Sequence, residues 1–252
     1  MKKRAILLLT RNSCHILPFF VKSLQEYVNR GVYDIIVYDN GSNKVQLEIL
    51  NTYVKDKTFD YFETTNGVNY LYTRGANWLL RKAIERNPEI EHLVLVNPDI
   101  EFLEDWDKDI ESNEGIMGFV MKNEWGHIEH AGAVGLGDHI GKGIRDNKEI
   151  FTELRNVDWV TFACVDINRK VIDKIGFLEE KYCHFSSDRV FCKKAIKNGF
   201  NILCSPSRLI HGFGKSTRFY SYDDVPDDIW QEMVEERKSQ GVHIVKNISK
   251  TW

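Results

Sequence analysis

Four short segments of this chain carry side chains whose types suit catalysis or ligand binding. They are Asp39-Asn40-Gly41-Ser42, Asn97-Pro98-Asp99, Phe185-Ser186-Ser187-Asp188 and His211-Gly212-Phe213-Gly214-Lys215-Ser216. An ionised carboxylate accepts hydrogen bonds and can take up a proton, and an imidazole can exchange protons or bind a metal ion. The segments are far apart in the sequence, so the fold must bring them together for them to act as one site.

Several polar residues directly follow segments that the sequence predicts to be strands. Apolar runs predict strands at 5–9, 34–38, 59–63 and 92–96, and helical spacing of apolar residues predicts helices between them, the last over about 73–86. This alternation is typical of a parallel sheet, which binds ligands at the carboxyl ends of its strands. The residues at those ends are Thr10, Asp39, Asn97 and Asp99. We expect them to line one crevice.

The pattern changes from about residue 114. We predict strands at 117–121, 157–167 and 201–204, and loops and hairpins in the glycine-rich stretch 126–143. Short helices are predicted at 169–175 and 187–198, the second ending at Gly199. The tail from residue 222 is acidic and then helical to about residue 239. No internal repeat or low-complexity linker separates the two parts, so we expect them to share an interface.

Composition excludes several classes of protein. The 252 residues are 42% hydrophobic and 28% charged, which is enough apolar material for a large core. The net charge of −3 argues against general nucleic-acid binding, because such proteins usually carry a basic surplus. Five cysteines without a C-x-x-C pair fit neither a disulfide framework nor a zinc ribbon. The chain shows no transmembrane run and no signal peptide, so we expect a cytoplasmic protein.

Common phosphate-binding and hydrolase motifs are absent. Gly214-Lys215-Ser216 has the end of a P-loop, but Leu209 stands where the first glycine belongs. No Gly-x-Gly-x-x-Gly dinucleotide motif, Gly-x-Ser-x-Gly motif or His-Glu-x-x-His pair occurs.

The order and spacing of the four segments resemble the inverting nucleotide-sugar glycosyltransferases of family 2, and within them the rhamnosyltransferase-like enzymes. The resemblance covers about residues 4–217 and includes Arg74-Gly75-Ala76-Asn77, similar to an Arg-x-x-Asn motif at a helix start, and 157–161, similar to a strand of the acceptor half. It implies an α/β protein with the GT-A fold, in which helices flank a Rossmann-like, mostly parallel central sheet and a smaller mixed half binds the acceptor. The implied parts are a nucleotide-sugar-binding half at 1–112, an acceptor-binding and catalytic half at 113–220, and an acidic helical tail at 221–252.

The resemblance assigns nucleotide binding to Thr10, Asp39, Arg74, Asn77 and Asn97. A carboxylate at Asp39 can accept the N3–H of uracil or thymine, whereas the N3 acceptor of cytosine would be repelled. The implied donor is therefore a UDP- or dTDP-sugar. The alternative role for Asp39 is to close an Asx turn that caps the following helix.

The resemblance also implies a divalent cation, Mn²⁺ or Mg²⁺, near Asp99 and His211. In the family an Asp-x-Asp motif holds the metal, and here Asn97 replaces its first aspartate. Oxygen ligands with one imidazole suit such ions, which stabilise a departing diphosphate. Glu101 is either a further ligand or a solvated acid. The alternative for His211 is an ordinary surface or core histidine.

Asp188 resembles the second residue of the family's Glu-Asp motif, whose Asp acts as the catalytic base towards the acceptor hydroxyl. The chain departs from the motif at Ser187, where Glu is usual. The alternative role for Asp188 is to stabilise the first turn of its helix. We also expect Trp159 and Tyr182 to lie near the acceptor and Lys215 to assist the phosphates.

The implied activity is transfer of a sugar with inversion to a saccharide or lipid-linked glycan, in surface-polysaccharide biosynthesis. The second alternative is a nucleotide-sugar or glycan-binding module without catalysis, suggested by Asn97 and Ser187. A third is a nucleotidyltransferase, which would release pyrophosphate. A lipid-linked acceptor would place the chain at the inner membrane face, and the acidic tail would either close over the site or form a homodimer contact.

Overall fold

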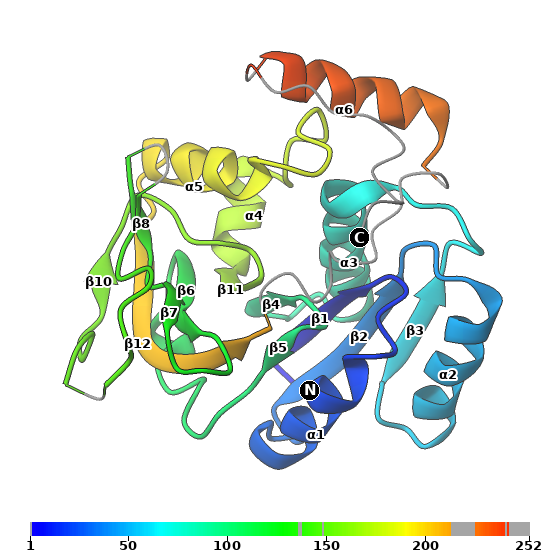
Figure 1. Ribbon diagram of the computed structural model, residues 1–252, viewed down its shortest axis with the longest axis horizontal. Coiled ribbons are helices and arrows are strands. Elements are labelled where there is room, and N and C mark those ends of the chain that lie inside the picture. Colours follow the sequence, from blue (N-terminus) through cyan, green and yellow to red (C-terminus); the bar gives the residue numbers. More distant parts are fainter. Residues whose placement is uncertain (1, 136–137, 148, 213–224, 240, 242–252) are drawn as a thin grey trace.

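A mixed β-sheet runs through the middle of the molecule (Figure 1). The computed structural model describes residues 2–135, 138–147, 149–212, 225–239 and 241. The strands of the sheet are β1 (Arg4–Thr10), β2 (Tyr33–Asp39), β3 (Tyr61–Thr64), β4 (His92–Val96), β5 (Ile100–Glu101), β6 (Ile116–Lys122), β7 (Ile128–His130), β10 (Arg155–Asn156), β11 (Cys164–Asn168) and β12 (Ile202–His211). A separate pair is formed by β8 (Ala133–Val134) and β9 (Asp138–His139).

The order of strands in the sheet is β10-β12-β6-β11-β4-β1-β2-β3, with β5 beside β12 and β7 beside β6. Strands β3, β2, β1 and β4 are parallel, so their carboxyl ends meet at one edge as the sequence predicts. Strand β11 is antiparallel to both β4 and β6. One continuous sheet therefore joins the predicted nucleotide-sugar-binding half to the predicted acceptor half.

The helices of the described chain are α1 (Leu17–Tyr27), α2 (Lys44–Lys55), α3 (Leu71–Arg86), α4 (Arg169–Ile175), α5 (Ser187–Lys197) and α6 (Asp227–Ser239), with a 3-10 turn at Ile110–Ser112. Local sequence explains their ends. Pro18 lies in the first turn of α1, where its missing N–H costs nothing. The side chain of Asn43 accepts a hydrogen bond from the Gln46 N–H and caps α2. Gly199 follows α5 with φ of +86°, a conformation that favours glycine.

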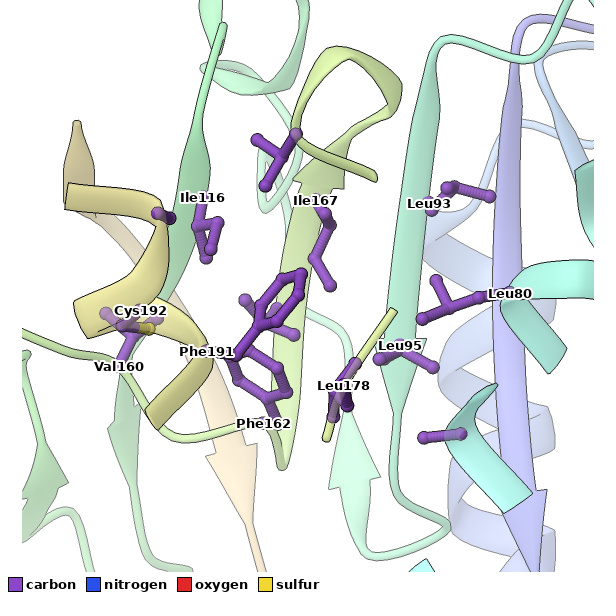
Figure 2. Close-up of a cluster of buried hydrophobic side chains, with 14 of the residues drawn as sticks. Leu80, Leu93, Leu95, Ile116, Val160, Phe162, Ile167, Leu178, Phe191 and Cys192 are labelled. Carbon is purple, nitrogen blue, oxygen red and sulfur yellow. The ribbon is translucent and has the colours of Figure 1, made fainter. Parts of the chain in front are cut away.

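Alternate residues of the buried strands supply two cores. In β1, Ala5 and Leu7 belong to one cluster, and Ile6 and Leu8 belong to the other. Helices α3, α4 and α5 cover the first face, and Figure 2 shows part of that cluster, between α5 and the strands. Helices α1 and α2 cover the second face together with the segment 102–110. The sheet is thus a layer buried between helices.

The structure corrects two predicted strands. Only β11, from Cys164, is formed within the predicted strand 157–167, because the chain turns at Phe162 and Ala163 before it pairs with β4. The last strand is longer than the predicted 201–204 and extends to His211 as β12. A register shift between Ser205 and Arg208 lets this strand pass Pro206, which cannot donate to the ladder. This extension carries His211 towards the edge where β4 ends.

Helix α6 packs on its own chain. Its apolar residues Ile229, Trp230 and Met233 contact the buried side chains of Leu71 and Cys183. The predicted helical part of the acidic tail is therefore confirmed, while Asp223 and Asp224 lie outside the described residues.

The chain contains five cysteines. All five are free thiols, and four of them are buried. Among the described helices, none has the length and hydropathy needed to cross a membrane.

Candidate active site

A cavity of about 480 Å³ opens at the carboxyl ends of β1 and β4. The residues that line it include six polar residues from β1 and the four segments: Thr10, Asn97, Asp99, Ser187, Asp188 and His211. The fold therefore brings together one candidate base, two candidate metal ligands and two polar residues predicted to bind the nucleotide.

Thr10 ends β1 and Asn97 directly follows β4, which is paired with β1 in the sheet. Thr10 is 2% exposed, and its hydroxyl has no hydrogen-bond partner among the described residues. The Asn97 N–H donates to the Ala163 carbonyl at 2.8 Å, which ties the end of β4 to the turn before β11. A buried hydroxyl without a partner is costly unless a ligand or water satisfies it, so Thr10 is placed as a ligand contact requires.

Asp99 and His211 meet because β5 and β12 pair antiparallel, with His211 opposite Ile100. The Gly212 N–H donates to the Asp99 carbonyl at 2.8 Å and extends this pairing. His211 Nε2 lies 3.8 Å from Asp99 Oδ2. Two ligands that each lie about 2.1 Å from one divalent ion are at most about 4.2 Å apart, so this pair fits a shared cation. The described residues form no cluster of three or more metal-ligating side chains.

Glu129 on β7 orients the imidazole of His211. Its carboxylate lies 3.1 Å from His211 Nδ1, and since an ionised carboxylate only accepts, Nδ1 donates and Nε2 is left facing Asp99. Burial acts to lower the pKa of His211, but the hydrogen bond with Glu129 and the charges of Asp99 and Glu129 raise it overall. The sequence did not reveal Glu129, because this residue lies in the irregular glycine-rich stretch. It comes close to His211 because β7 pairs with β6 and β6 pairs with β12.

Removing the charge of Glu129 is expected to weaken metal binding. In Glu129→Gln the imidazole of His211 loses its carboxylate partner, and the loss of such a partner typically reduces metal affinity about 10- to 100-fold. Titration of Mn²⁺, followed by the electron paramagnetic resonance of the free ion, measures this. The control is Glu153→Gln, because Glu153 is exposed. Equal Mn²⁺ affinity in the two variants would contradict the role of Glu129.

Asp188 is in the first turn of α5, two residues after the strained residue Ser186. Ser186 precedes the helix with φ of 60°, a conformation that costs energy in residues other than glycine and often occurs at functional sites. The Arg189 N–H donates to Asp188 Oδ1 at 2.7 Å. Burial is the main cause that raises the pKa of Asp188, and backbone hydrogen bonds and the Arg189 charge only partly offset it. Ser187, which replaces the expected Glu, is 3% exposed and also lines the cavity.

Asp39 lies behind the cavity wall. It is fully buried and is not among the residues that line the cavity. Its carboxylate accepts from the Ser42 N–H at 3.0 Å, from the Ser42 hydroxyl, and from the Thr64 hydroxyl at 3.0 Å. These contacts match the alternative Asx-turn role.

Arg74 and Asn77 are placed outside the cavity. The Arg74 guanidinium pairs with Glu232 of α6 at 2.8 Å and with Glu180 at 3.6 Å. The Asn77 amide donates to the Leu178 carbonyl at 2.9 Å and accepts from the Leu178 N–H at 3.0 Å. Both side chains thus fix the segment 178–180 against α3, and their positions give no support to the predicted nucleotide contacts.

The predicted acceptor and phosphate contacts also lie away from the cavity or outside the described chain. Trp159 is 8% exposed and packs against His130 and His139, with ring centroids 5.7 and 5.0 Å away. Tyr182 lines a second cavity, under α6, together with Arg74. Lys215 lies outside the described residues. Neither aromatic residue is among those that line the first cavity.

Comparison with known sequences gives one distant relative. No protein-family model matches the chain. A protein of Sinorhizobium fredii named y4gI, described only as uncharacterized, is 26% identical over 242 residues. The match covers 88% of this chain and 25% of that protein, so the chain spans about a quarter of its relative's length.

Solved glycosyltransferase structures have the same fold. GalNAc-T7 with UDP, GalNAc and Mn²⁺ has a TM-score of 0.66 and 14% identity, covering 96% of this chain and 52% of that one. TarS 1–349 of S. aureus with UDP-GlcNAc has a TM-score of 0.59 and 17% identity, covering 94% and 66%. The mannosyltransferase PcManGT of Pyrobaculum calidifontis with GDP-Man and Mn²⁺ has a TM-score of 0.59 and 11% identity, covering 86% and 58%.

These likenesses extend over nearly the whole chain, although the chain spans only 39% of the longer TarS structure. The chain therefore has an α/β fold with a mixed, mostly parallel central sheet flanked by helices, which matches GT-A glycosyltransferase structures.

Proposed function

We propose that this chain is a metal-assisted glycosyltransferase that moves a sugar from a nucleotide-sugar donor to a glycan acceptor with inversion. One observation carries the proposal: Asp188, Asp99 and His211 line the same cavity at the carboxyl edge of a GT-A sheet. A base and a leaving-group site in one cavity are what a single displacement at a sugar carbon requires.

Asp188 is the base in this proposal. The acceptor oxygen attacks the anomeric carbon, its proton passes to the Asp188 carboxylate, and the bond between that carbon and the diphosphate oxygen breaks. One displacement of this kind inverts the configuration. Burial keeps the pKa of Asp188 above its ordinary value, which makes its carboxylate a stronger base than an exposed one.

Asp99 and His211 would hold the cation at the other end of the reacting bond. Mn²⁺ or Mg²⁺ bound there supplies positive charge against the charge that develops on the departing diphosphate. Glu129 holds the His211 imidazole with Nε2 towards Asp99. Two solved neighbours that contain Mn²⁺ together with a nucleotide or nucleotide-sugar support this assignment.

The proposed donor is a UDP- or dTDP-sugar. Neighbours of the same fold bind UDP-GlcNAc and GDP-Man, so the fold itself does not select the base. The pyrimidine preference rests on Asp39, whose carboxylate also accepts hydrogen bonds from Ser42 and Thr64. The rhamnosyltransferase-like subgroup, the saccharide or lipid-linked acceptor and the place in surface-polysaccharide biosynthesis rest on the sequence resemblance.

Product analysis tests the proposal. The purified chain is incubated with Mn²⁺ and UDP-, dTDP- or GDP-sugars, with and without glycan acceptors, and the released products are separated. Release of a nucleoside diphosphate together with a glycosylated acceptor is the expected result. Nucleotide binding without release would favour the binding module suggested by Ser187, and release of pyrophosphate would favour a nucleotidyltransferase.

A further inference from the structure

The turn before β11, formed by residues 161–163, is part of the cavity wall. Hydrogen bonds to two neighbouring strands hold both ends of this turn. The Thr161 N–H donates to His130 Nε2 on β7 at 3.2 Å. The Asn97 N–H, directly after β4, donates to the Ala163 carbonyl at 2.8 Å. The ends of the turn are therefore fixed to the sheet, and its middle residue is held separately.

Tyr72 on α3 holds that middle residue, Phe162. The Tyr72 hydroxyl donates to the Phe162 carbonyl at 2.9 Å and so ties α3 to the turn. Tyr72 also lines the cavity, although the mechanism above gives it no role. Burial raises the pKa of Tyr72, and the charge of Asp188 raises it further. The hydroxyl therefore stays protonated at neutral pH and remains a donor.

Phe162 in turn contacts the helix that carries the proposed base. Its ring lies edge-on to the ring of Phe191 on α5, with the centroids 6.1 Å apart. Burial raises the pKa of Asp188, and the hydrogen bonds that partly offset this effect include those from the backbones of Arg189 and Phe162. A carboxylate only accepts hydrogen bonds, so the backbone group of Phe162 that serves Asp188 is its N–H. One residue thus joins the Tyr72 hydroxyl to the carboxylate of the base.

We propose that Tyr72 is a positioning residue that holds Phe162 in place and thereby orients the Asp188 carboxylate towards the acceptor hydroxyl. This inference rests on the proposed function and deepens it. Without the Tyr72 hydroxyl, the Phe162 carbonyl loses this donor, and the turn can shift to find another. The N–H of Phe162 then moves relative to Asp188. A misplacement of about 1 Å in a reacting group can cost about 100-fold in rate.

The groups around Asp188 set the direction of the expected pH effect. The charge of Arg189 on α5 lowers the pKa of Asp188. Cys192 on α5 and Tyr72 on α3 feel the charge of Asp188, and both have raised pKa values that keep them neutral at pH 7. Weakening the Phe162 hydrogen bond removes one interaction that lowers the pKa of Asp188, so this pKa is expected to rise. The lining also contains four other ionisable side chains, those of Arg11, Asp99, His184 and His211.

The test uses Tyr72→Phe, which keeps the ring and removes the hydroxyl. We expect kcat for sugar transfer to fall about 10- to 100-fold, UDP affinity to stay unchanged, and the acid limb of the kcat/KM profile to move to higher pH. The matched control is Tyr33→Phe. Tyr33 is fully buried on the α1 side of the sheet, and its hydroxyl donates to Asp107 Oδ2 at 2.9 Å. This control also loses a tyrosine hydrogen bond, but its kcat and its acid limb are expected to stay at the wild-type values.

A direct titration of Asp188 gives a readout that needs no turnover. Carbon-13 NMR of the side-chain carboxyl groups measures its pKa, and the Asp188 signal is identified by its loss in Asp188→Asn. We expect a higher pKa in Tyr72→Phe than in the wild type and in Tyr33→Phe. If thermal unfolding shows that Tyr72→Phe is not folded, all three proteins are compared at a lower temperature in sucrose, which favours the folded state.

The outcomes separate this inference from the proposed function. An unchanged pKa of Asp188 in Tyr72→Phe would overturn the inference, as would an unchanged kcat or an equal loss of kcat in Tyr33→Phe. A wild-type chain that transfers no sugar from any of the nucleotide-sugars contradicts the proposed function itself. In that case the NMR comparison still decides whether Tyr72 acts on Asp188.

Discussion

Replacing Asp188 by Asn is expected to reduce sugar transfer by about 10²- to 10⁴-fold, the usual contribution of a general base, while UDP still binds. Asparagine keeps the size of the side chain and can still accept from the Arg189 N–H, but it cannot take up the acceptor proton. Single-turnover transfer rates and UDP calorimetry on the same variant measure the two effects. A variant that transfers sugar at the wild-type rate would remove Asp188 from the mechanism.

The matched control is Asp173→Asn on α4. Asp173 is also a helix aspartate, but its side chain is 57% exposed and pairs with Arg169 on the surface. Its replacement is expected to leave transfer unchanged, because a surface ion pair contributes little.

The pH dependence of transfer gives an independent readout for Asp188. Burial raises its pKa, so on acidification the carboxylate is protonated, and the base is lost, at a higher pH than for an ordinary aspartate of about 3.9. The acid limb of the kcat/KM profile is therefore expected above that value. An acid limb at or below it would contradict a buried base.

Replacing Trp106 by Ala is expected to lower the free energy of unfolding by about 3–5 kcal/mol, the range for removing a buried aromatic side chain. Trp106 is fully buried and has ring centroids 4.5 Å from Phe102, 5.6 Å from Tyr33 and 5.8 Å from Phe119. Its indole N–H also donates to the Tyr27 carbonyl at 3.2 Å, which the variant leaves without its partner. Urea unfolding followed by circular dichroism measures the loss.

Trp125→Ala is the matched control for this measurement. Trp125 is 71% exposed, so its replacement is expected to change stability by no more than about 0.5 kcal/mol. A loss below about 1 kcal/mol for Trp106→Ala would mean that the core on the α1 side of the sheet can rearrange around the cavity.

Local patterns in the sequence predict much of the first hundred residues. The structure confirms a strand at 92–96 as β4. The sequence predicts it because a short apolar run between polar residues is typical of a buried strand. The positions of Thr10, Asn97 and Asp99 at the cavity also follow from one general property of parallel sheets. These features depend on spacing along the chain, which the sequence displays directly.

The remaining parts depend on contacts between distant segments. The extension of β12 to His211 requires pairing with β6 and β5, which local propensity does not reveal. Glu129 belongs to no recognisable motif and reaches His211 only when the sheet is assembled. Arg74 and Asn77 match a family motif in sequence, but in the structure partners at 178–180 and on α6 occupy their side chains.

The pairing of β4 with β11 has a consequence for folding during synthesis. Every residue of both strands is buried, and Val96 of β4 lies opposite Cys164 of β11. A nascent chain that has made only β1 to β4 would expose an apolar strand with unpaired amides, which is a template for aggregation. Such distant pairings also slow folding, and the edge of β4 that faces β11 stays unpaired until β11 has been synthesised.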